Sequence, residues 1–317
     1  SLKEGDITFR CNLVTLSEEE PYTQKTMVDY SSDEITTEEA HTLIADLAKA
    51  FDTEEIHFHG GISYRHLMVW NGVSLDFQLT PPHDISLRPV TEYLPKGPNS
   101  AVLLDFMQRS YELLNHHPIN EKRRQRGLHP ANSIWIWGEG EKPHLDSFMD
   151  KFGLKGSVIS AVDLVKGIGI CANMQTIDVE GATGNIDTNF EGKAKAAIEA
   201  LRGGSDFVYL HFEAPDECGH RHETENKIKS IEYLDNRVLA YLLPELEKLK
   251  EEFSIMVLPD HPTPLSLRTH TRDAVPYLIY RSHDVQQHDW TYSEKEASKT
   301  GILVDPGYTL MQRFLQR

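Results

Sequence analysis

Short apolar runs that alternate with helical patterns dominate the chain from about residue 131 onward. The runs have the length of strands and are apolar throughout, as expected when helices cover both faces of a sheet. Two amphipathic segments, 190–203 and 225–250, lie between runs. The alternation predicts an α/β fold with a doubly wound, mostly parallel sheet. The expected strands are NSIWIW (132–137), GSVISA (156–161), SDFVYLHF (205–212), FSIMVLPD (253–260) and PYLIYR (276–281). One side of the helix expected over 225–250 carries Ile228, Ile231, Leu234, Val238, Leu242 and Leu249.

The N-terminal part of the chain has a different order of predicted strands and helices. Segment 6–16 is rich in β-forming residues and predicts a strand, and 55–70 predicts two strands around a Gly-Gly turn. Apolar spacings of three and four predict helices over 36–51 and 100–117, the first capped by Thr36 or Thr37. Helices interleaved with at least three strands predict a smaller α+β module.

The segment 117–132 is polar, basic and contains proline, and it is the best candidate for a domain boundary. A chain of 317 residues is long enough for two domains. We therefore expect an inserted, substrate-binding α+β domain over 1–128 and a metal-binding α/β core over 129–317.

The charge balance and the cysteines limit the partners and the compartment. A formal net charge of −17 argues against general nucleic-acid binding, which needs a basic surface. No apolar run approaches the roughly 18 residues that span a bilayer, so no membrane partner is expected. The three cysteines Cys11, Cys171 and Cys218 form no CxxC pair, which suits a reducing compartment and predicts a cytoplasmic location.

Acidic residues and histidines follow two of the expected strands. Asp216 and His220 come after 205–212, Asp260 ends 253–260 and His261 follows it, and His270 comes after a short loop. A single such residue is usually a cap or a surface residue, but the strand ends of a doubly wound sheet converge on one edge. Carboxylate oxygen with imidazole nitrogen suits zinc, manganese or iron. Five donors exceed one tetrahedral site and fall short of two, which indicates a two-metal centre with ligands from elsewhere.

These residues carry a resemblance. PDECGH, LPDHPTP and RTHT resemble the metal-binding signatures of the alkaline phosphatase superfamily. More narrowly, the chain resembles the archaeal-type, cofactor-independent (2,3-bisphosphoglycerate-independent) phosphoglycerate mutases, from its first residues to its last helix. The further matching stretches are ITFRCNLVT, MVDYS, SYRHLMVW, TPPHDI, HPANSIWIWGEG, GSVISAVDLVKGIGI and GATGNIDTNFEGKA.

The resemblance implies two divalent metal ions and no 2,3-bisphosphoglycerate. It assigns Asp216, His220 and His270 to one ion and Asp260 with His261 to part of the other. Mn²⁺ is the expected metal, with Mg²⁺, Zn²⁺ and Co²⁺ left open. The family pattern also has an Asp-Gly at the end of an N-terminal strand and, downstream, a nucleophilic serine that becomes phosphorylated. Neither has a match here, so we expect that an N-terminal segment with the nucleophilic serine is missing and that the fragment is inactive.

A phosphoglycerate substrate carries about three negative charges, which arginine and lysine side chains would bind. Arg10, Arg65, Arg123 and Lys166 are the candidates, and the resemblance implies that the inserted domain supplies contacts across an interdomain cleft. His66 is the candidate for proton transfer at a glycerate hydroxyl. The basic run around Arg123 has the alternative of a solvated face.

The expected function is the interconversion of 3-phosphoglycerate and 2-phosphoglycerate through a phosphoserine at a two-metal site, as in glycolysis and gluconeogenesis. The enzyme is then an isomerase with a small-molecule partner, and its oligomeric state stays open. The alternatives are a metal-dependent phosphatase or another phosphomutase on the same core, and a non-catalytic module that binds phosphorylated metabolites.

Overall fold

The computed structural model describes residues 2–287 and 289–316. The chain forms two compact units, Ser1–Pro143 and His144–Arg317. We describe each unit by itself. Among the described residues, no helix has the length and apolar character needed to cross a bilayer.

Unit 1 is built on an antiparallel sheet around one long strand. The predicted strand over 6–16 is confirmed as β1, which pairs antiparallel with β2, β4 and β5, while β3 pairs with β4. The Gly-Gly turn predicted within 55–70 connects β3 and β4. The strands are β1 (Asp6–Leu16), β2 (Met27–Asp29), β3 (Ile56–His59), β4 (Arg65–Asn71) and β5 (Ser133–Glu141).

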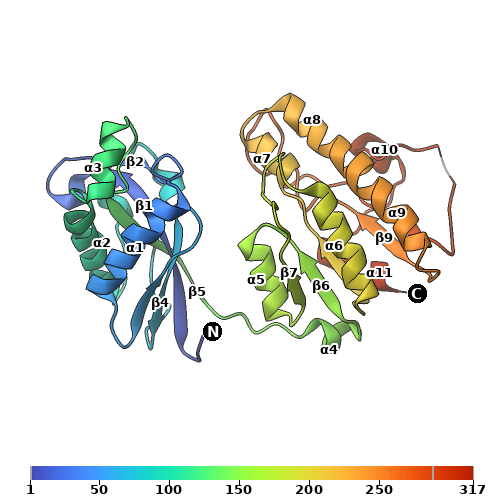
Figure 1. Ribbon diagram of the computed structural model, residues 1–317, viewed down its shortest axis with the longest axis horizontal. Coiled ribbons are helices and arrows are strands. Elements are labelled where there is room, and N and C mark those ends of the chain that lie inside the picture. The colour runs from blue at the N-terminus through green and yellow to red at the C-terminus, as the bar shows by residue number, and fades with distance from the viewer. Residues whose placement is uncertain (1, 288, 317) are drawn as a thin grey trace. The chain divides into compact units, whose positions relative to one another are not determined.

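Two helices cover one face of this sheet, as Figure 1 shows. The helix α1 (Thr37–Phe51) begins at Thr36, whose side chain accepts a hydrogen bond from the Glu39 N–H, and α2 (Ser100–Leu114) follows the second predicted segment. Three phenylalanine rings from α1, β3 and α2 meet at centroid distances of 5.2 to 5.9 Å. Burial of this aromatic surface stabilises the packing of the helices on the sheet. Short 3₁₀ turns lie at Tyr22–Gln24, Pro82–Ile85 and Thr91–Tyr93.

The segment expected as a polar boundary is a helix, and the strand after it lies in unit 1. The helix α3 (Pro118–Gln125) has Pro118 in its first turn, and the His117 side chain accepts a hydrogen bond from the Ile119 N–H. β5 pairs antiparallel with β1, so NSIWIW does not belong to a parallel core. Its run of buried residues from Ser133 to Ile136 looks like a parallel strand in sequence because both of its faces are covered. The compact unit ends at Pro143, whereas the predicted boundary lies before β5.

In unit 2 the strands expected within 156–161 and 205–212 are parallel neighbours. Those expected within 253–260 and 276–281 pair antiparallel with each other, so the expectation that they belong to the parallel sheet is wrong. Three parallel strands are ordered β7-β6-β8, with α5 against β6 and β7 and α6 against β6 and β8, whereas β9 and β10 form a separate antiparallel pair. The strands are β6 (Gly156–Ile159), β7 (Gln175–Ile177), β8 (Phe207–Leu210), β9 (Ser254–Val257) and β10 (Leu278–Arg281). The helices are α4 (Phe148–Phe152), α5 (Asp163–Cys171), α6 (Phe190–Arg202), α7 (Ala214–His220), α8 (Thr224–Tyr233), α9 (Ala240–Glu247), α10 (Glu294–Lys299) and α11 (Leu310–Leu315), with a 3₁₀ turn at Gly307–Thr309.

The long helix predicted over 225–250 is divided into α8 and α9 by a π-helical turn at Leu234–Leu239. The side predicted to be buried is buried in the middle, where Val238 is 3% exposed. It is exposed at the start, where Ile228 and Ile231 are 54% and 53% exposed. Instead, α8 turns polar side chains inward: Lys227 donates to the carbonyl oxygens of Pro215 and Thr263. These bonds supply both carbonyl oxygens with a donor and tie α8 to α7 and to the loop after β9.

Candidate active site

Asp216 and His220 project from one side of the short helix that follows β8. The helix α7 has a proline in its first turn. The N–H groups of a first turn have no partner within the helix, so the missing N–H of proline costs no hydrogen bond there. Residues four apart lie on the same helix face, and Asp216 Oδ2 is 3.3 Å from His220 Nε2. The strand end and the helix start therefore place a carboxylate and an imidazole side by side.

His270, from the loop between β9 and β10, completes a group of three donors. His270 Nε2 lies 3.0 Å from His220 Nε2 and 3.3 Å from Asp216 Oδ1. Ligand atoms on a tetrahedral ion with bonds of 2.0–2.2 Å lie about 3.3–3.6 Å apart. The three ligand atoms, all within 4.8 Å of one another, thus fit a divalent cation.

The surroundings orient this triad. His220 Nδ1 is 3.0 Å from the Arg268 carbonyl oxygen; donation to that oxygen leaves Nε2 with its lone pair facing His270. The Thr263 hydroxyl donates to Asp216 Oδ1. A Cβ on Gly219 would lie 2.5 Å from the Thr263 carbonyl oxygen, so only glycine lets α7 approach this loop so closely. Sequence reasoning missed Thr263, whose only signal was its place in LPDHPTP.

We expect Gly219→Ala to lower the affinity for Mn²⁺ about 10-fold, because α7 must move away from the Thr263 backbone and ligand geometry tolerates little displacement. Isothermal titration with MnCl₂ measures the change. The matched control is Gly167→Ala in α5, where an added Cβ would meet nothing within 4 Å. Equal affinities for both variants would show that the close approach at Gly219 does not shape the site.

The predicted pair Asp260 and His261 lies beside the triad. His261 Nδ1 is 4.0 Å from Asp216 Oδ1, and the His261 and His270 ring centroids are 3.7 Å apart. The Asp260 side chain is 67% exposed, with Oδ2 3.3 Å from His261 Nε2. One carboxylate and one imidazole are fewer ligands than a tetrahedral ion takes. The role of this pair at a second metal stays a prediction.

A second group of possible ligands in unit 1 has the character of a structural network. Asp29 accepts hydrogen bonds from Ser31 and from the Asp33 N–H. Asp33 accepts from the His129 N–H, and its other oxygen is 2.9 Å from His129 Nδ1. The carboxylates are already engaged. Burial by itself would raise the pKa of Asp33, but the hydrogen bonds from His129, with a smaller contribution from the Arg123 charge, lower it. A cation here would compete with these bonds and with the arginine charge.

A buried lysine supports the strand end that precedes α7. Lys193 is 1% exposed; its Nζ donates to the His211 carbonyl oxygen at 3.2 Å and lies 4.8 Å from the Phe212 ring centroid. Burial lowers the pKa of Lys193 to about 8, and burial also lowers the pKa of His211. Sequence reasoning missed this residue, although a lysine on the apolar side of the segment 190–203 was a visible signal.

Two of the predicted substrate-binding arginines lie exposed in unit 1. The Arg10 guanidinium carbon is 4.9 Å from the Trp137 ring centroid, and that of Arg65 is 4.3 Å from the Tyr64 ring centroid. Within residues 2–287 and 289–316, neither guanidinium has an acidic partner. The ion-paired arginines of the same unit are Arg109, Arg123, Arg124 and Arg126. Arg10 and Arg65 thus keep their donors available for an anionic ligand.

Arg123, unlike Arg10 and Arg65, has no exposed guanidinium for an anionic ligand. It is 1% exposed and donates to the Glu39 carboxylate and to the carbonyl oxygens of Ser32 and His129. These bonds tie α3 to the start of α1 and engage all three nitrogens of the guanidinium. The prediction that Arg123 binds the substrate is therefore wrong.

His66 also differs from its expected role. Alternate residues of a strand face opposite sides of a sheet, so His66 turns away from Arg65 toward the helix-covered face, where it is 5% exposed. Its Nδ1 accepts a hydrogen bond from the Gly61 N–H, and Nε2 has no hydrogen-bond partner among the described atoms. Burial lowers the pKa of His66 to about 4. A side chain in this position cannot exchange protons with a substrate hydroxyl.

Lys166 lies on α5 in unit 2 and is 2.8 Å from the Asp178 carboxylate, whose side chain is 87% exposed. An exposed partner of this kind is easily exchanged for another anion. Its predicted contact with substrate stays a prediction.

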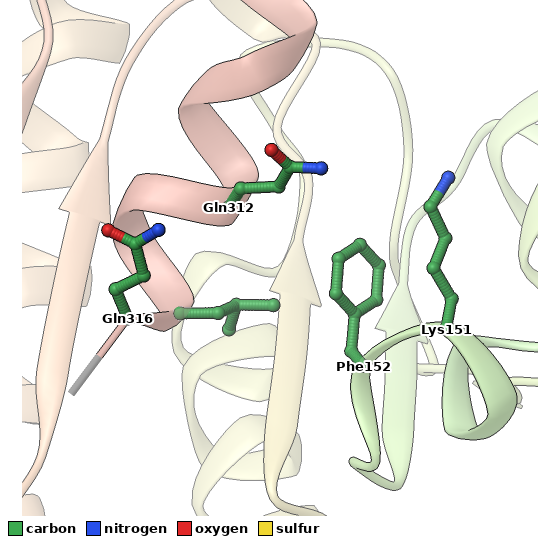
Figure 2. A pocket seen from close by; sticks show the side chains of 5 residues that line it. Lys151, Phe152, Gln312 and Gln316 are labelled. Carbon is green, nitrogen blue, oxygen red and sulfur yellow. The ribbon is translucent and has the colours of Figure 1, made fainter.

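A hollow of about 340 Å³ lies elsewhere in unit 2, between α4 and α11. Figure 2 shows the Phe152 ring between Lys151 and the two glutamines Gln312 and Gln316. Leu315 completes the lining, and the hollow offers no carboxylate or imidazole. It is not part of the candidate active site.

Two family models match overlapping parts of the chain. A family model described as type I phosphodiesterase / nucleotide pyrophosphatase matches residues 98–264, and one described as 2,3-bisphosphoglycerate-independent phosphoglycerate mutase matches residues 1–120. The mixed α/β architecture and these matches define a protein of the alkaline phosphatase-like class.

Relatives and solved structures narrow this class. The chain is 46% identical to a Methanosarcina mazei 2,3-bisphosphoglycerate-independent phosphoglycerate mutase, over 96% of this chain and 75% of the relative. It is 46% identical to a Geobacter sulfurreducens protein described as a probable enzyme of this kind, over 100% of this chain and 78% of the relative. The chain belongs to the family of 2,3-bisphosphoglycerate-independent phosphoglycerate mutases, which are isomerases.

Two solved structures are similar in fold. A Pyrococcus horikoshii protein superposes with a TM-score of 0.71 at 28% identity, over 94% of this chain and 70% of that one. The cofactor-independent phosphoglycerate mutase of Thermoplasma acidophilum gives a TM-score of 0.60 at 20% identity, over 98% of this chain and 77% of that one. The second supports the fold alone.

Proposed function

We propose that the protein interconverts 3-phosphoglycerate and 2-phosphoglycerate by transfer of the phosphoryl group through a phosphoserine. The observation that supports this most is the triad Asp216, His220 and His270 in a member of this family, with one ligand atom from each residue and all three within 4.8 Å of one another. A divalent cation held there supplies positive charge beside the transferring phosphoryl group and favours the ionised form of a hydroxyl nucleophile. We further propose that the metal is Mn²⁺, that Asp260 and His261 serve a second ion, and that the enzyme acts in the cytoplasm on a small-molecule substrate.

The residues of this chain have separate tasks in the proposal. Asp216, His220 and His270 bind the metal, while Thr263 and the Arg268 carbonyl oxygen fix the direction of two of these ligands. The proposal assigns the phosphate and carboxylate groups of the substrate to arginines of unit 1 and to Lys166. Arg forks match these groups with two parallel hydrogen bonds.

No serine of this chain is assigned as the nucleophile. Ser32 is fully buried and hydrogen-bonded to Thr15, and the Ser63 hydroxyl donates to the Ile35 carbonyl oxygen. Both side chains therefore hold loops of unit 1 in place.

We expect Arg65→Met to weaken binding of 3-phosphoglycerate about 10- to 100-fold, the cost of losing charged hydrogen bonds of about 1.5–3 kcal/mol. Isothermal titration in the presence of Mn²⁺ measures it. Arg88→Met is the matched control, because Arg88 is an exposed arginine of the same unit whose side chain, among the residues that the structure describes, bonds only to the Tyr93 hydroxyl. Equal weakening by both variants would indicate a general charge effect and contradict a specific role for Arg65.

A metal-dependent phosphatase is the second candidate, favoured by the phosphodiesterase match over residues 98–264. The protein at its natural length, assayed with 3-phosphoglycerate in the presence and absence of Mn²⁺, separates the two. Formation of 2-phosphoglycerate, detected with enolase, supports the mutase. Release of inorganic phosphate without 2-phosphoglycerate would support the phosphatase instead.

A further inference from the structure

The backbone around Arg10 is shaped to accommodate its side chain. The pairing of β1 with β5 shifts register between Thr8 and Arg10, which is the mark of a β-bulge. On the partner strand β5, Gly138 has φ +62, and a Cβ at this residue would lie 3.3 Å from Arg10 Cδ. A glycine in the left-handed region therefore leaves the space through which the Arg10 side chain crosses β5.

The indole under Arg10 is held firmly in place. The Trp137 indole N–H donates to Asn12 Oδ1 at 3.0 Å, and Asn12, which is 4% exposed, donates from Nδ2 to the Tyr30 carbonyl oxygen at 3.3 Å. The edge of the His83 ring lies against the same indole, with centroids 5.3 Å apart. Asn12 thus anchors Trp137 from within the sheet, and the indole presents a fixed aromatic face.

Stacking on the indole face leaves the N–H donors of the Arg10 guanidinium available, whereas an ion pair would not. A carboxylate partner takes up two N–H donors of a guanidinium, whereas a ring face attracts the cation and leaves the donors at its edge available. Arg10 is exposed and, within the described ranges, unpaired, in a chain whose formal net charge is −17. An arginine that forms no ion pair with Asp or Glu and is held on a rigid ring is preorganised for bidentate binding of an oxyanion.

We propose that Trp137, supported by Asn12 and Gly138, is a positioning residue that presents Arg10 to a phosphate or carboxylate group of the substrate. This rests on the proposed function, since it names the part of unit 1 that receives an anionic group of phosphoglycerate. The contrary view is that Arg10 only covers the indole as a surface packing contact. In that case Arg10 and Trp137 would contribute to fold stability and not to ligand affinity.

A double-mutant cycle on the full chain tests the proposal, with 3-phosphoglycerate as the titrant and Mn²⁺ present. We expect Arg10→Met to weaken binding about 10- to 100-fold and Trp137→Leu about 3- to 10-fold. In the Arg10→Met background, Trp137→Leu should have no further effect, because the indole acts only through the guanidinium. Trp137→Phe keeps an aromatic face and should restore most of the affinity.

Gly138→Asn gives a second line of evidence if Trp137→Leu impairs folding. Asparagine tolerates the left-handed conformation but adds a Cβ against Arg10, so affinity should fall in the parent and stay unchanged in the Arg10→Met background. Additive effects of Trp137→Leu and Arg10→Met, or no effect of Trp137→Leu and Gly138→Asn, would overturn the positioning role while leaving the proposed function intact. No effect of either Arg10→Met or Arg65→Met would instead count against the substrate side of the proposed function.

Discussion

Replacing His220 by alanine should lower the affinity of the protein for Mn²⁺ by more than about 100-fold, because even outer-shell partners of metal ligands are worth about 10- to 100-fold. The variant removes one of three donors, and the Arg268 carbonyl oxygen loses its imidazole partner as well. Metal that binds only the folded state at 1,000 times its Kd stabilises it by about 4 kcal/mol. After a 100-fold loss of affinity, the same metal concentration would stabilise by only about 1.4 kcal/mol.

The measurements are direct titration with MnCl₂ and the shift of the thermal midpoint with and without metal. His222→Asn is the matched control, because His222 lies two residues away with its Nδ1 on the Leu265 carbonyl oxygen, outside the triad. Asparagine suits its φ of +59. Unchanged affinity and an unchanged thermal shift in His220→Ala would eliminate the triad as the metal site.

The fold could be predicted well wherever local periodicity and burial agree. The strand over 6–16 and the helix from residue 37 onward are read from β-forming residues, apolar spacing and a threonine cap, and these local signals match what the tertiary structure uses. β5 was placed in the wrong sheet because a strand covered on both faces has the same sequence whichever partners it has. Pairing partners are decided by contacts between distant segments, which no local pattern contains.

The sequence correctly indicated that Asp216, His220 and His270 lie close together, and their binding of a metal stays a prediction. The convergence of strand ends at one sheet edge explains only Asp216 and His220, because β9 pairs antiparallel with β10 outside the parallel sheet. The roles of the residues expected to bind the substrate are harder to predict from the sequence. Arg10 and Arg123 look alike in sequence, yet one is exposed on an indole and the other is buried among carbonyl oxygens. His66 next to Arg65 shows the same limit, since the pleat sends neighbours to opposite faces. What a charged residue does depends on which side of its element is covered, and that is a tertiary property.

The buried imidazole of His66 should make unit 1 lose stability as the pH falls. Its pKa is about 4 in the folded state against 6.5 when it is free, so between these values the unfolded chain binds a proton that the folded chain does not. Stability is therefore fully retained above pH 6.5 and is lost as the pH falls toward 4, by about 3 kcal/mol in total and about 2 kcal/mol at pH 5. Desolvation is the main cause, and His41 of α1 adds a like charge when both rings are protonated.

His66→Asn isolates this contribution, because an asparagine Oδ1 can accept the Gly61 N–H in place of Nδ1 but does not titrate. Urea unfolding of the parent and the variant at pH 7.5 and pH 5 should show a difference in pH dependence of about 2 kcal/mol, with the variant less sensitive. Carboxylates such as Asp33 and Glu39, whose pKa values are lowered in the fold, destabilise both proteins equally at low pH and cancel in the comparison. His116→Asn, at a ring that is 83% exposed, should match the parent. Parallel pH dependence in the parent and His66→Asn would mean that His66 takes up its proton without leaving the folded state, and therefore that its pocket admits water or a hydrogen-bond acceptor for Nε2.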